Sequence, residues 1–392
     1  MKSASGVRKI AIVTSTRADW GLLSPVARHL QAYPGVELQI IATNMHLDAS
    51  RGMTAGEIAS DGFQISRRVE MPSASSLPAD VCHAAALCLD GMGEAFSELQ
   101  PDLLLMLGDR FEMLAVALAA TISRIPIAHI SGGETTLGAI DDNIRHALTK
   151  LSSLHFPTTE THRQRIIAMG EQPDRVINAG ALGVDSFSKM TPLPKAEIER
   201  FINMTIDQST LLVTYHPATA DSLPPSQGLR SLLNALASLN DVKIIITYPN
   251  NDPGSDGLID MINAFAAERP GSVAAVPSLG HKRYLSALHY VDAVIGNSSS
   301  GIVEVPSAGI PTVDIGMRQH GRTASESVIH CDNSTAAITA SINKALSPEW
   351  RRKCAAAPNP YHKPGTAAII ADALVKCDIS TLLPKHFYDI GQ

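Results

Sequence analysis

Short apolar runs alternate with longer helical patterns along the chain, and this alternation limits the fold more than any other feature. In the first half the runs predict strands at residues 9–15, 36–43, 103–108, 125–130 and 176–178. In the second half they predict strands at residues 211–215, 243–248, 273–276, 293–295 and 312–315. Continuous apolar strands joined by helices are typical of parallel sheets covered on both faces. Two such series predict an α/β chain of two Rossmann-like domains.

The two predicted series separate near residues 188–207, where Pro192 and Pro194 interrupt the pattern. A length of 392 residues gives room for two cores. We therefore expect an N-terminal domain over residues 1–190 and a C-terminal domain over residues 205–365. A helix predicted at residues 366–377 is expected to pack back on the first domain.

The composition narrows the classes of partner. Apolar residues make up 45% of the chain and aromatic residues 4%, which is typical of a soluble α/β protein. A net charge of −6 gives no reason to expect binding to nucleic acid or to an anionic membrane. The five cysteines form no C-x-x-C pair, so the sequence predicts neither a zinc site nor disulfides. The apolar run Ile10–Val13 is too short for a secretory or spanning segment, and we expect a cytoplasmic protein.

A turn of small residues follows the predicted strand at residues 293–295, and a helix is predicted to begin within it. Free backbone N–H groups and the positive end of the helix dipole make such a turn suited to phosphate. Glu304, about one helical turn further on, is placed to accept from sugar hydroxyls. A serine-rich N-cap without a ligand is the alternative. The turn consists of Asn297, Ser298, Ser299, Ser300 and Gly301.

Charged and imidazole side chains directly follow several predicted strands. In doubly wound sheets ligands bind beyond the C-terminal ends of the strands, so we expect these side chains to form one site in a cleft between the domains. Each also has a structural alternative. Arg17 would pair with Asp19, Asp109 would cap the following helix, and His216 would be a core histidine. For Asp19, Asp142 and His129 the structural role is preferred. The proposed site contains Arg17, Asp109, Glu134, Asp141, Arg145, His216, Arg318 and Arg322.

Seven segments, spread in order over nearly the whole chain, carry a family resemblance. They are T-S-T-R-A-D-W-G (14–21), L-G-D-R-F-E (107–112), H-I-S-G-G-E-T-T-L (129–137), D-D-N-I-R-H-A-L-T-K (141–150), Y-H-P (215–217), G-N-S-S-S-G-I-V-E-V-P-S (296–307) and R-Q-H-G-R (318–322). With these segments the chain resembles the hydrolysing UDP-N-acetylglucosamine 2-epimerases, in particular the bacterial branch of the sialic-acid capsule pathway. The resemblance implies the GT-B architecture, in which two Rossmann-like domains face a central cleft.

The resemblance implies a role for each part of the site. The diphosphate of UDP would lie on Ser298, Ser299 and Ser300, the ribose hydroxyls on Glu304, and the uracil near Tyr284. Arg17 would reach the phosphates from the first domain. The remaining residues implied to bind the UDP-sugar are Asn297, Gly301, Arg318 and Arg322. The residues implied to act in catalysis are Asp109, Glu134, Asp141, Arg145 and His216.

The implied reaction expels UDP from C1 while a proton leaves C2, and water then adds to the resulting 2-acetamidoglucal. The products are N-acetylmannosamine and UDP, and the reaction needs no metal or other cofactor. Many members of the family carry glutamate where this chain has Ser131. Two candidates therefore remain for the carboxylate that moves the C2 proton, Glu134 and Asp141. The resemblance also implies a homodimer.

Three alternatives remain at this point. The chain could act as a hydrolysing 2-epimerase on a UDP- or GDP-linked 2,4-diacetamido-trideoxyhexose for legionaminic acid. It could be a non-hydrolysing 2-epimerase, in which UDP stays attached to the product. A GT-B glycosyltransferase or a silent nucleotide-sugar binder would use the same phosphate site.

Overall fold

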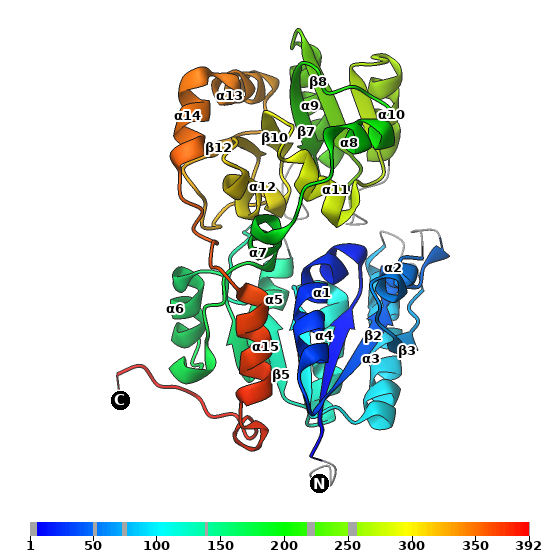
Figure 1. Cartoon of the computed structure of the whole chain (residues 1–392), viewed down its shortest axis with the longest axis vertical. Coiled ribbons are helices and arrows are strands. Elements are labelled where there is room, and N and C mark those ends of the chain that lie inside the picture. The colour runs from blue at the N-terminus through cyan, green and yellow to red at the C-terminus, as the bar shows by residue number, and fades with distance from the viewer. Residues whose placement is uncertain are drawn as a thin grey trace. The chain divides into compact units, whose positions relative to one another are not determined.

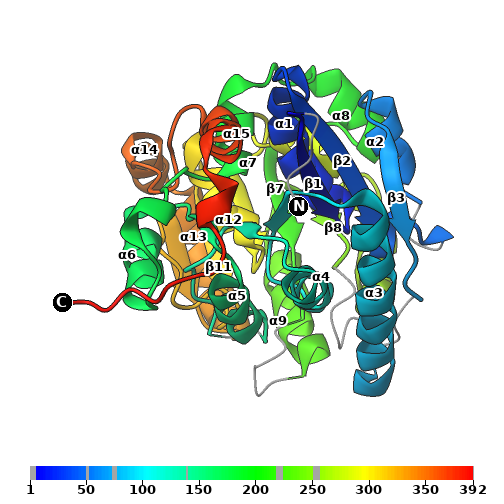
Figure 2. The same cartoon turned by 90° about the horizontal axis from the view of Figure 1, so that it is seen from below.

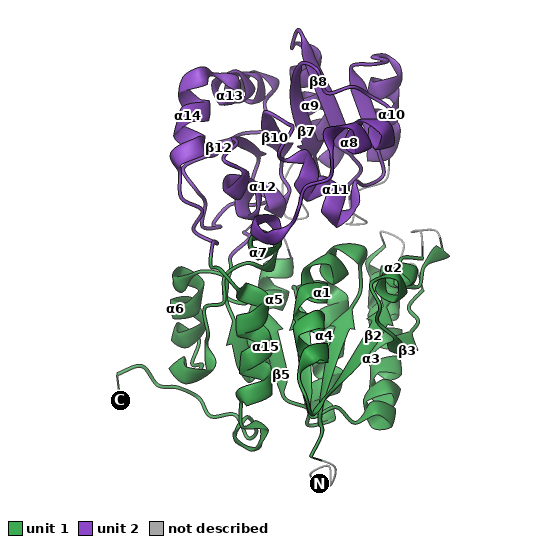
Figure 3. Cartoon of the chain, in the orientation of Figure 1, with its two compact units in different colours: residues 1–134, 141–186, 363–392 green, residues 135–140, 187–362 purple. Residues whose placement is uncertain are grey.

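The computed structural model describes residues 6–49, 53–72, 77–137, 140–217, 224–249 and 257–391. The chain divides into two compact units (Figure 3). Unit 1 contains residues 1–134, 141–186 and 363–392, and unit 2 contains residues 135–140 and 187–362. Each unit is built around its own six-stranded sheet (Figure 1).

Unit 1 holds a parallel sheet with the strand order β3-β2-β1-β4-β5-β6. Its strands are β1 (Arg8–Thr14), β2 (Val36–Thr43), β3 (Ile65–Val69), β4 (Leu103–Leu107), β5 (Ile127–Ile130) and β6 (Leu154–Phe156). Its helices are α1 (Arg17–Ala32), α2 (Ala55–Ser60), α3 (Pro78–Leu99), α4 (Phe111–Ile122), α5 (Asp141–Leu151), α6 (Glu160–Ala168) and α15 (Thr366–Lys376), and α7 (Leu182–Lys189) crosses into unit 2.

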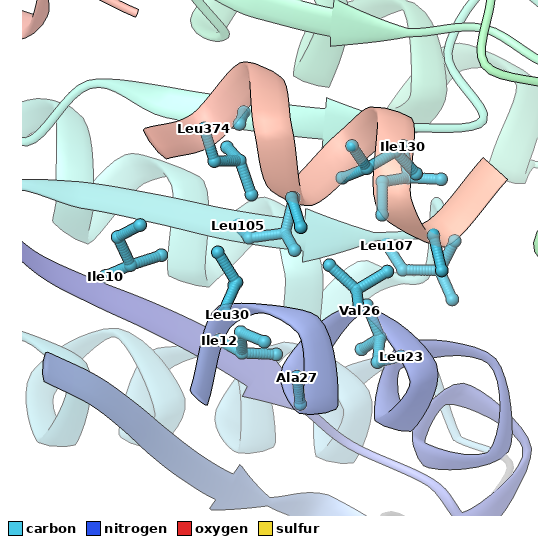
Figure 4. Close-up of a cluster of buried hydrophobic side chains, with 14 of the residues drawn as sticks. Ile10, Ile12, Leu23, Val26, Ala27, Leu30, Leu105, Leu107, Ile130 and Leu374 are labelled. Atoms are coloured by element: carbon cyan, nitrogen blue, oxygen red, sulfur yellow. The ribbon is translucent and has the colours of Figure 1, made fainter. Parts of the chain in front are cut away.

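Both faces of this sheet are buried, which explains why its strands are continuous apolar runs. Ile10 and Ile12 of β1 point to one face and join a cluster with α1 and with Leu374 of α15 (Figure 4). Ala11 and Val13 point to the other face and join a cluster with α3 and α4. Successive residues of a strand point to opposite faces, so a strand buried on both sides needs apolar residues throughout.

Unit 2 repeats this plan with the strand order β12-β11-β10-β7-β8-β9, again parallel. Its strands are β7 (Ser209–Thr214), β8 (Val242–Thr247), β9 (Val273–Val276), β10 (Ala293–Gly296), β11 (Thr312–Ile315) and β12 (Val328–Cys331). Its helices are α8 (Lys195–Ile202), α9 (Pro225–Ala237), α10 (Leu258–Ala267), α11 (Gly280–Ala287), α12 (Ser299–Val303), α13 (Thr335–Leu346) and α14 (Pro348–Ala356). Short 3₁₀ turns lie at Asn44–His46, Pro173–Arg175, Val305–Ala308 and Ile379–Thr381.

The prediction of two Rossmann-like sheets is confirmed, and three strands lie outside the predicted set. β3, β6 and β12 stand at sheet edges and are three to five residues long, so none forms a long apolar run. The strand predicted at residues 176–178 is wrong. Only Val176 pairs there, in an isolated bridge to His155 at the edge of the sheet.

The unit limits differ from the expected domain limits at three places. Residues 187–190, expected in the first domain, and residues 191–204, expected between the domains, belong to unit 2, because Ile198 and Ile202 of α8 are buried there with Leu285. Residues 363–365, expected in the second domain, belong to unit 1. Residues 135–140 also belong to unit 2, where Thr135 Oγ1 donates to the carbonyl of Gly321 at 2.6 Å. α15 packs against α1 in unit 1.

Among the residues that the structure describes, no helix is both long enough and apolar enough to cross a membrane.

Candidate active site

Arg145, in the second turn of α5, organises the acidic residues of unit 1. Its buried guanidinium donates from Nε to Asp109 Oδ2 at 2.8 Å, and a second N–H also reaches Asp109. The same group donates to Asp142 Oδ1 and to the backbone carbonyl of Glu134, both at 3.1 Å. Burial alone would lower the pKa of Arg145, but the surrounding carboxylates outweigh it and raise the pKa. Arg145 is therefore a fixed cation, and Asp109 is bound to it.

Glu134 lies in a sharply turned loop after β5, and its side chain is 3% exposed. Thr158 Oγ1 donates to Glu134 Oε1 at 3.0 Å and also contacts His162 Nδ1 at 3.0 Å. The loop needs a glycine at Gly133, where φ is +78° and a Cβ would lie 2.5 Å from the His162 carbonyl oxygen. Ser131, with φ +66°, turns the chain at the start of the loop. The sequence H-I-S-G-G-E thus delivers one buried carboxylate.

Asp141 is the first residue of α5 and lies one helical turn before Arg145. Carboxylates in a first helical turn are stabilised by the helix dipole. The structure therefore gathers Asp109, Glu134 and Arg145 by direct contacts, and carries Asp141 on the helix that holds Arg145.

His129 of β5 has a structural role within reach of this cluster. Its Nε2 donates to the carbonyl of Gly108 at 2.8 Å, and the side chain is fully buried. Burial lowers the pKa of His129 to about 4, so the ring is neutral at pH 7. His129 fixes the peptide next to Asp109.

The segment after β1 bears on the alternative in which Arg17 only pairs with Asp19. Asp19 accepts from the backbone N–H of Thr16 at 3.0 Å and from Ser15 Oγ at 2.8 Å, and Thr16 accepts from the Asp19 N–H, which completes a capping box. Arg17 instead lies 3.5 Å from Glu57 Oε1, and both side chains are partly exposed.

A second ion pair, not predicted from the sequence, lies near the C-terminal ends of the strands of unit 1. Glu112 is fully buried, and its Oε1 accepts from Arg110 Nε and from Asn44 Nδ2, both at 2.9 Å. These residues follow β4 and β2. The motif L-G-D-R-F-E contained the signal, because a buried acid in an apolar helix requires a cation nearby.

In unit 2 the small-residue turn lies between β10 and α12. Gly296 ends β10 with φ +138°, and a Cβ there would overlap the Thr214 carbonyl oxygen of β7. Ser298 is the N-cap of α12 and accepts from the Ser300 N–H at 3.4 Å. Ser299 begins the helix, Val303 ends it, and Glu304 is the C-cap residue. Gly301 is buried against Thr312 of β11.

Asn297 joins three segments of unit 2. Its side chain accepts from the His216 N–H at 2.7 Å and donates to the His216 carbonyl at 2.8 Å. Its own carbonyl accepts from Arg318 at 3.1 Å and from Gln319 Nε2 at 2.8 Å. The amide of Asn297 thus holds the backbone after β7, and Gln319 is a further residue that the sequence analysis missed. The backbone N–H of Arg322 donates to the Gln319 carbonyl at 3.2 Å and closes a turn over residues 319–322.

Tyr284 lies on α11, close enough to Glu304 for the two groups to interact electrostatically. Burial and this carboxylate raise the pKa of the Tyr284 phenol above its usual value, so the ring is neutral. The structure places Tyr284, Ser300 and Glu304 in one neighbourhood of unit 2.

The comparisons with known proteins identify the family. The family model described as UDP-N-acetylglucosamine 2-epimerase matches residues 28–375. The chain belongs to this family. Within the described residues of the chain, no group of three or more histidine, cysteine, aspartate or glutamate side chains is arranged to hold a metal ion.

Three curated relatives cover most of the chain. A Campylobacter jejuni protein named GDP/UDP-N,N'-diacetylbacillosamine 2-epimerase (hydrolyzing) is 34% identical and aligns with 98% of this chain and 99% of its own length. The Escherichia coli polysialic acid biosynthesis protein P7 is 33% identical, with 98% of both chains covered. A Legionella pneumophila protein named UDP-N,N'-diacetylbacillosamine 2-epimerase (hydrolyzing) is 35% identical, with 87% and 89% covered.

A solved structure confirms the two-domain fold of the chain. The crystal structure of UDP-GlcNAc 2-epimerase from Neisseria meningitidis bound to UDP-GlcNAc superposes with a TM-score of 0.78. It is 19% identical and covers 94% of this chain and all of its own. The cleft expected between the domains and the roles of the individual site residues stay predictions.

Proposed function

We propose that this epimerase is a hydrolysing 2-epimerase of a UDP-linked 2-acetamido sugar. The C1–O bond to UDP breaks as the C2 proton leaves, and water then adds to the glycal while a proton returns to C2 on the opposite face. The products are free UDP and the 2-epimeric free sugar. The observation that carries this proposal is the Asp109–Arg145–Glu134 cluster in a member of the 2-epimerase family whose relatives are named as hydrolysing.

Unit 1 supplies the acid–base groups of the proposed reaction. Proton transfer at C2 and activation of water require two groups that exchange protons. Arg145 makes a charge-assisted contact with Asp109, whereas Glu134 is buried beside a neutral hydroxyl donor. Different surroundings make two carboxylates suited to different roles. We assign the C2 proton to Glu134 or Asp141, because Ser131 has no acidic group.

Unit 2 supplies the nucleotide site. Backbone N–H groups at the start of α12, with the hydroxyls of Ser298, Ser299 and Ser300, would bind the diphosphate. Arg318 and Arg322 would add positive charge, and Glu304 would accept from the ribose. Asn297 and His216 would hold the turn in place through their two hydrogen bonds. Arg17 of unit 1 is a further proposed phosphate ligand.

For the sugar we propose UDP-N,N'-diacetylbacillosamine first. The relatives at 34% and 35% identity both carry that sugar in their names. UDP-N-acetylglucosamine, which would give N-acetylmannosamine for sialic acid, is the second candidate. The family model's description and the 33% identical polysialic acid protein favour it. We also propose a cytoplasmic homodimer, to be tested by light scattering.

Product analysis tests the reaction and the sugar together. The purified protein is given each UDP-sugar, and the GDP form of the diacetamido sugar, in deuterated water. We expect free nucleoside diphosphate and a 2-epimeric free sugar carrying one deuterium at C2, measured by mass spectrometry. Product that still carries UDP would show a non-hydrolysing epimerase. Absence of C2 deuterium with every donor would contradict both epimerase proposals.

Amide substitutions test the assignment of the acids. Glu134→Gln and Asp141→Asn should each abolish turnover and leave UDP affinity largely unchanged, because the nucleotide groups lie in unit 2. Glu160→Gln, an exposed glutamate on α6, is the matched control and should keep wild-type turnover. Full turnover in either test variant would remove that residue from the chemistry.

A further inference from the structure

The C-terminal segment after α15 is held at a defined place on unit 1. In both views the end of the chain lies beside α6 (Figure 1, Figure 2). The Tyr388 N–H donates to the carbonyl of Gly170 at 2.9 Å, and the Phe387 ring occupies the space that a side chain at Gly170 would need. Lys150 Nζ lies 4.8 Å from the centre of the same ring. The contacts with α5 and with the turn after α6 fix this segment.

Lys385 of this segment caps the C-terminal end of α5. Its Nζ donates to the carbonyls of Lys150 and Ser152 at 2.7 Å and to that of Thr149 at 3.3 Å. The last carbonyls of a helix have no partner within the helix, and the end carries a partial negative charge. An ammonium group from more than 230 residues away satisfies both requirements.

A buried carboxylate holds Lys385 in this position. Glu171 is 2% exposed, and its Oε2 lies 2.7 Å from Lys385 Nζ. The same carboxylate accepts from Lys150 at 2.6 Å and from His155 Nε2 at 3.1 Å. Burial by itself would raise the pKa of Glu171, but the hydrogen bonds from His155, Lys150 and Lys385 outweigh it and lower the pKa to about 2. Glu171 is therefore ionised at every pH at which the protein would work.

The helix that receives this cap is the one that carries the proposed catalytic groups. α5 has 11 residues and is about 16 Å long, with Asp141 in its first turn and Arg145 in its second. A helix is stiff over this length, so fixing its C-terminal end limits the movement of its first turns. A displacement of about 1 Å at a reacting group can cost about a hundredfold in rate.

We propose that Lys385 is a positioning residue for α5. By binding the C-terminal end of this helix, the C-terminal segment fixes the positions of Asp141 and Arg145. The proposal rests on the proposed function for its effect on turnover, and on the contacts above for its effect on the helix.

The test compares Lys385→Met with Lys376→Met in the full-length protein. Lys376 is the last residue of α15, directly before the C-terminal segment, but it is exposed and pairs only with Asp372 among the contacts described for it. In K385M we expect kcat to fall about tenfold, with KM and the Kd for UDP within about twofold of wild type. Hydrogen exchange of residues 141–152 should increase in K385M and stay at wild-type rates in K376M. A merely structural loss of stability would raise exchange throughout unit 1.

The outcomes distinguish the positioning role of Lys385 from the proposed function. If the wild-type protein turns over no UDP-sugar, the proposed function fails, and the exchange experiment still decides whether Lys385 caps α5. Wild-type kcat in K385M, or unchanged hydrogen exchange in residues 141–152, would contradict the positioning role of Lys385. If K385M does not fold, Lys385→Gln keeps two N–H donors without the charge, and the same exchange comparison then decides.

Discussion

At the scale of single residues, two buried groups set the backbone beside the proposed site. His129 is the first, because its ring holds the carbonyl of Gly108. In His129→Leu that carbonyl loses its partner, and we expect the free energy of unfolding to fall by about 1–3 kcal/mol. We also expect a lower kcat, since Asp109 is the next residue. Urea denaturation and steady-state kinetics measure the two effects. His29→Leu, an exposed histidine on α1, is the control, and an equal loss in both variants would contradict the prediction.

Gly296 is the second such residue, because β10 and β7 approach closely where it ends the strand. In Gly296→Ala the new methyl group overlaps the Thr214 carbonyl oxygen, so one strand end must move. The turn that begins at Asn297 moves with it. We expect at least about a tenfold weaker Kd for UDP, measured by titration calorimetry. Gly93→Ala, where the methyl group meets open space in α3, should leave the Kd unchanged. Unchanged UDP affinity in Gly296→Ala would show that the turn does not bind the nucleotide.

At the scale of the elements, the helix that follows β1 depends on its first turn. α1 begins at Arg17, because Thr16 and Asp19 form a capping box directly before it. In Thr16→Ala the Asp19 N–H loses its acceptor, and we expect a loss of about 1 kcal/mol in the free energy of unfolding. Ser60→Ala, which removes an exposed hydroxyl at the end of α2, is the control and should cost less than about 0.5 kcal/mol. Equal midpoints in urea would show that the box contributes nothing.

The same elements show which parts of the fold can be predicted from the sequence. Strands buried on both faces, such as β4 and β9, are continuous apolar runs, and their prediction from pattern is accurate. The edge strand β3 reads Ile-Ser-Arg-Arg-Val, with three polar residues among its five positions, so it lacks that signal. Motifs predicted which acids stand at strand ends. They could not predict that the Asn297 side chain hydrogen-bonds to the backbone of His216, or that Lys385 binds the end of α5. Both contacts join segments that are far apart in the chain.

At the scale of the whole molecule, each unit has its own core and one of the two tryptophans, Trp20 in unit 1 and Trp350 in unit 2. Fluorescence of a variant with Trp350→Phe therefore reports on unit 1 alone. Two buried groups of unit 1 make its stability depend on pH. The pKa of Glu171 is about 2 when folded and 4.5 when unfolded. The pKa of His129 is about 4 when folded and 6.5 when unfolded.

Both shifts make unit 1 less stable in acid. The unfolded chain takes up a proton at His129 first, so stability falls as the pH drops from 6.5 to 4. Glu171 contributes stability above pH 4.5, and this contribution is lost as the pH falls toward 2, on the order of 3 kcal/mol in all. In Glu171→Gln we expect lower stability at pH 7 and a flatter dependence between pH 4.5 and 2, followed by urea midpoints from the Trp20 signal. If the variant and the parent protein lose stability in parallel over that range, Glu171 is not the buried anion that the lysines and His155 hold.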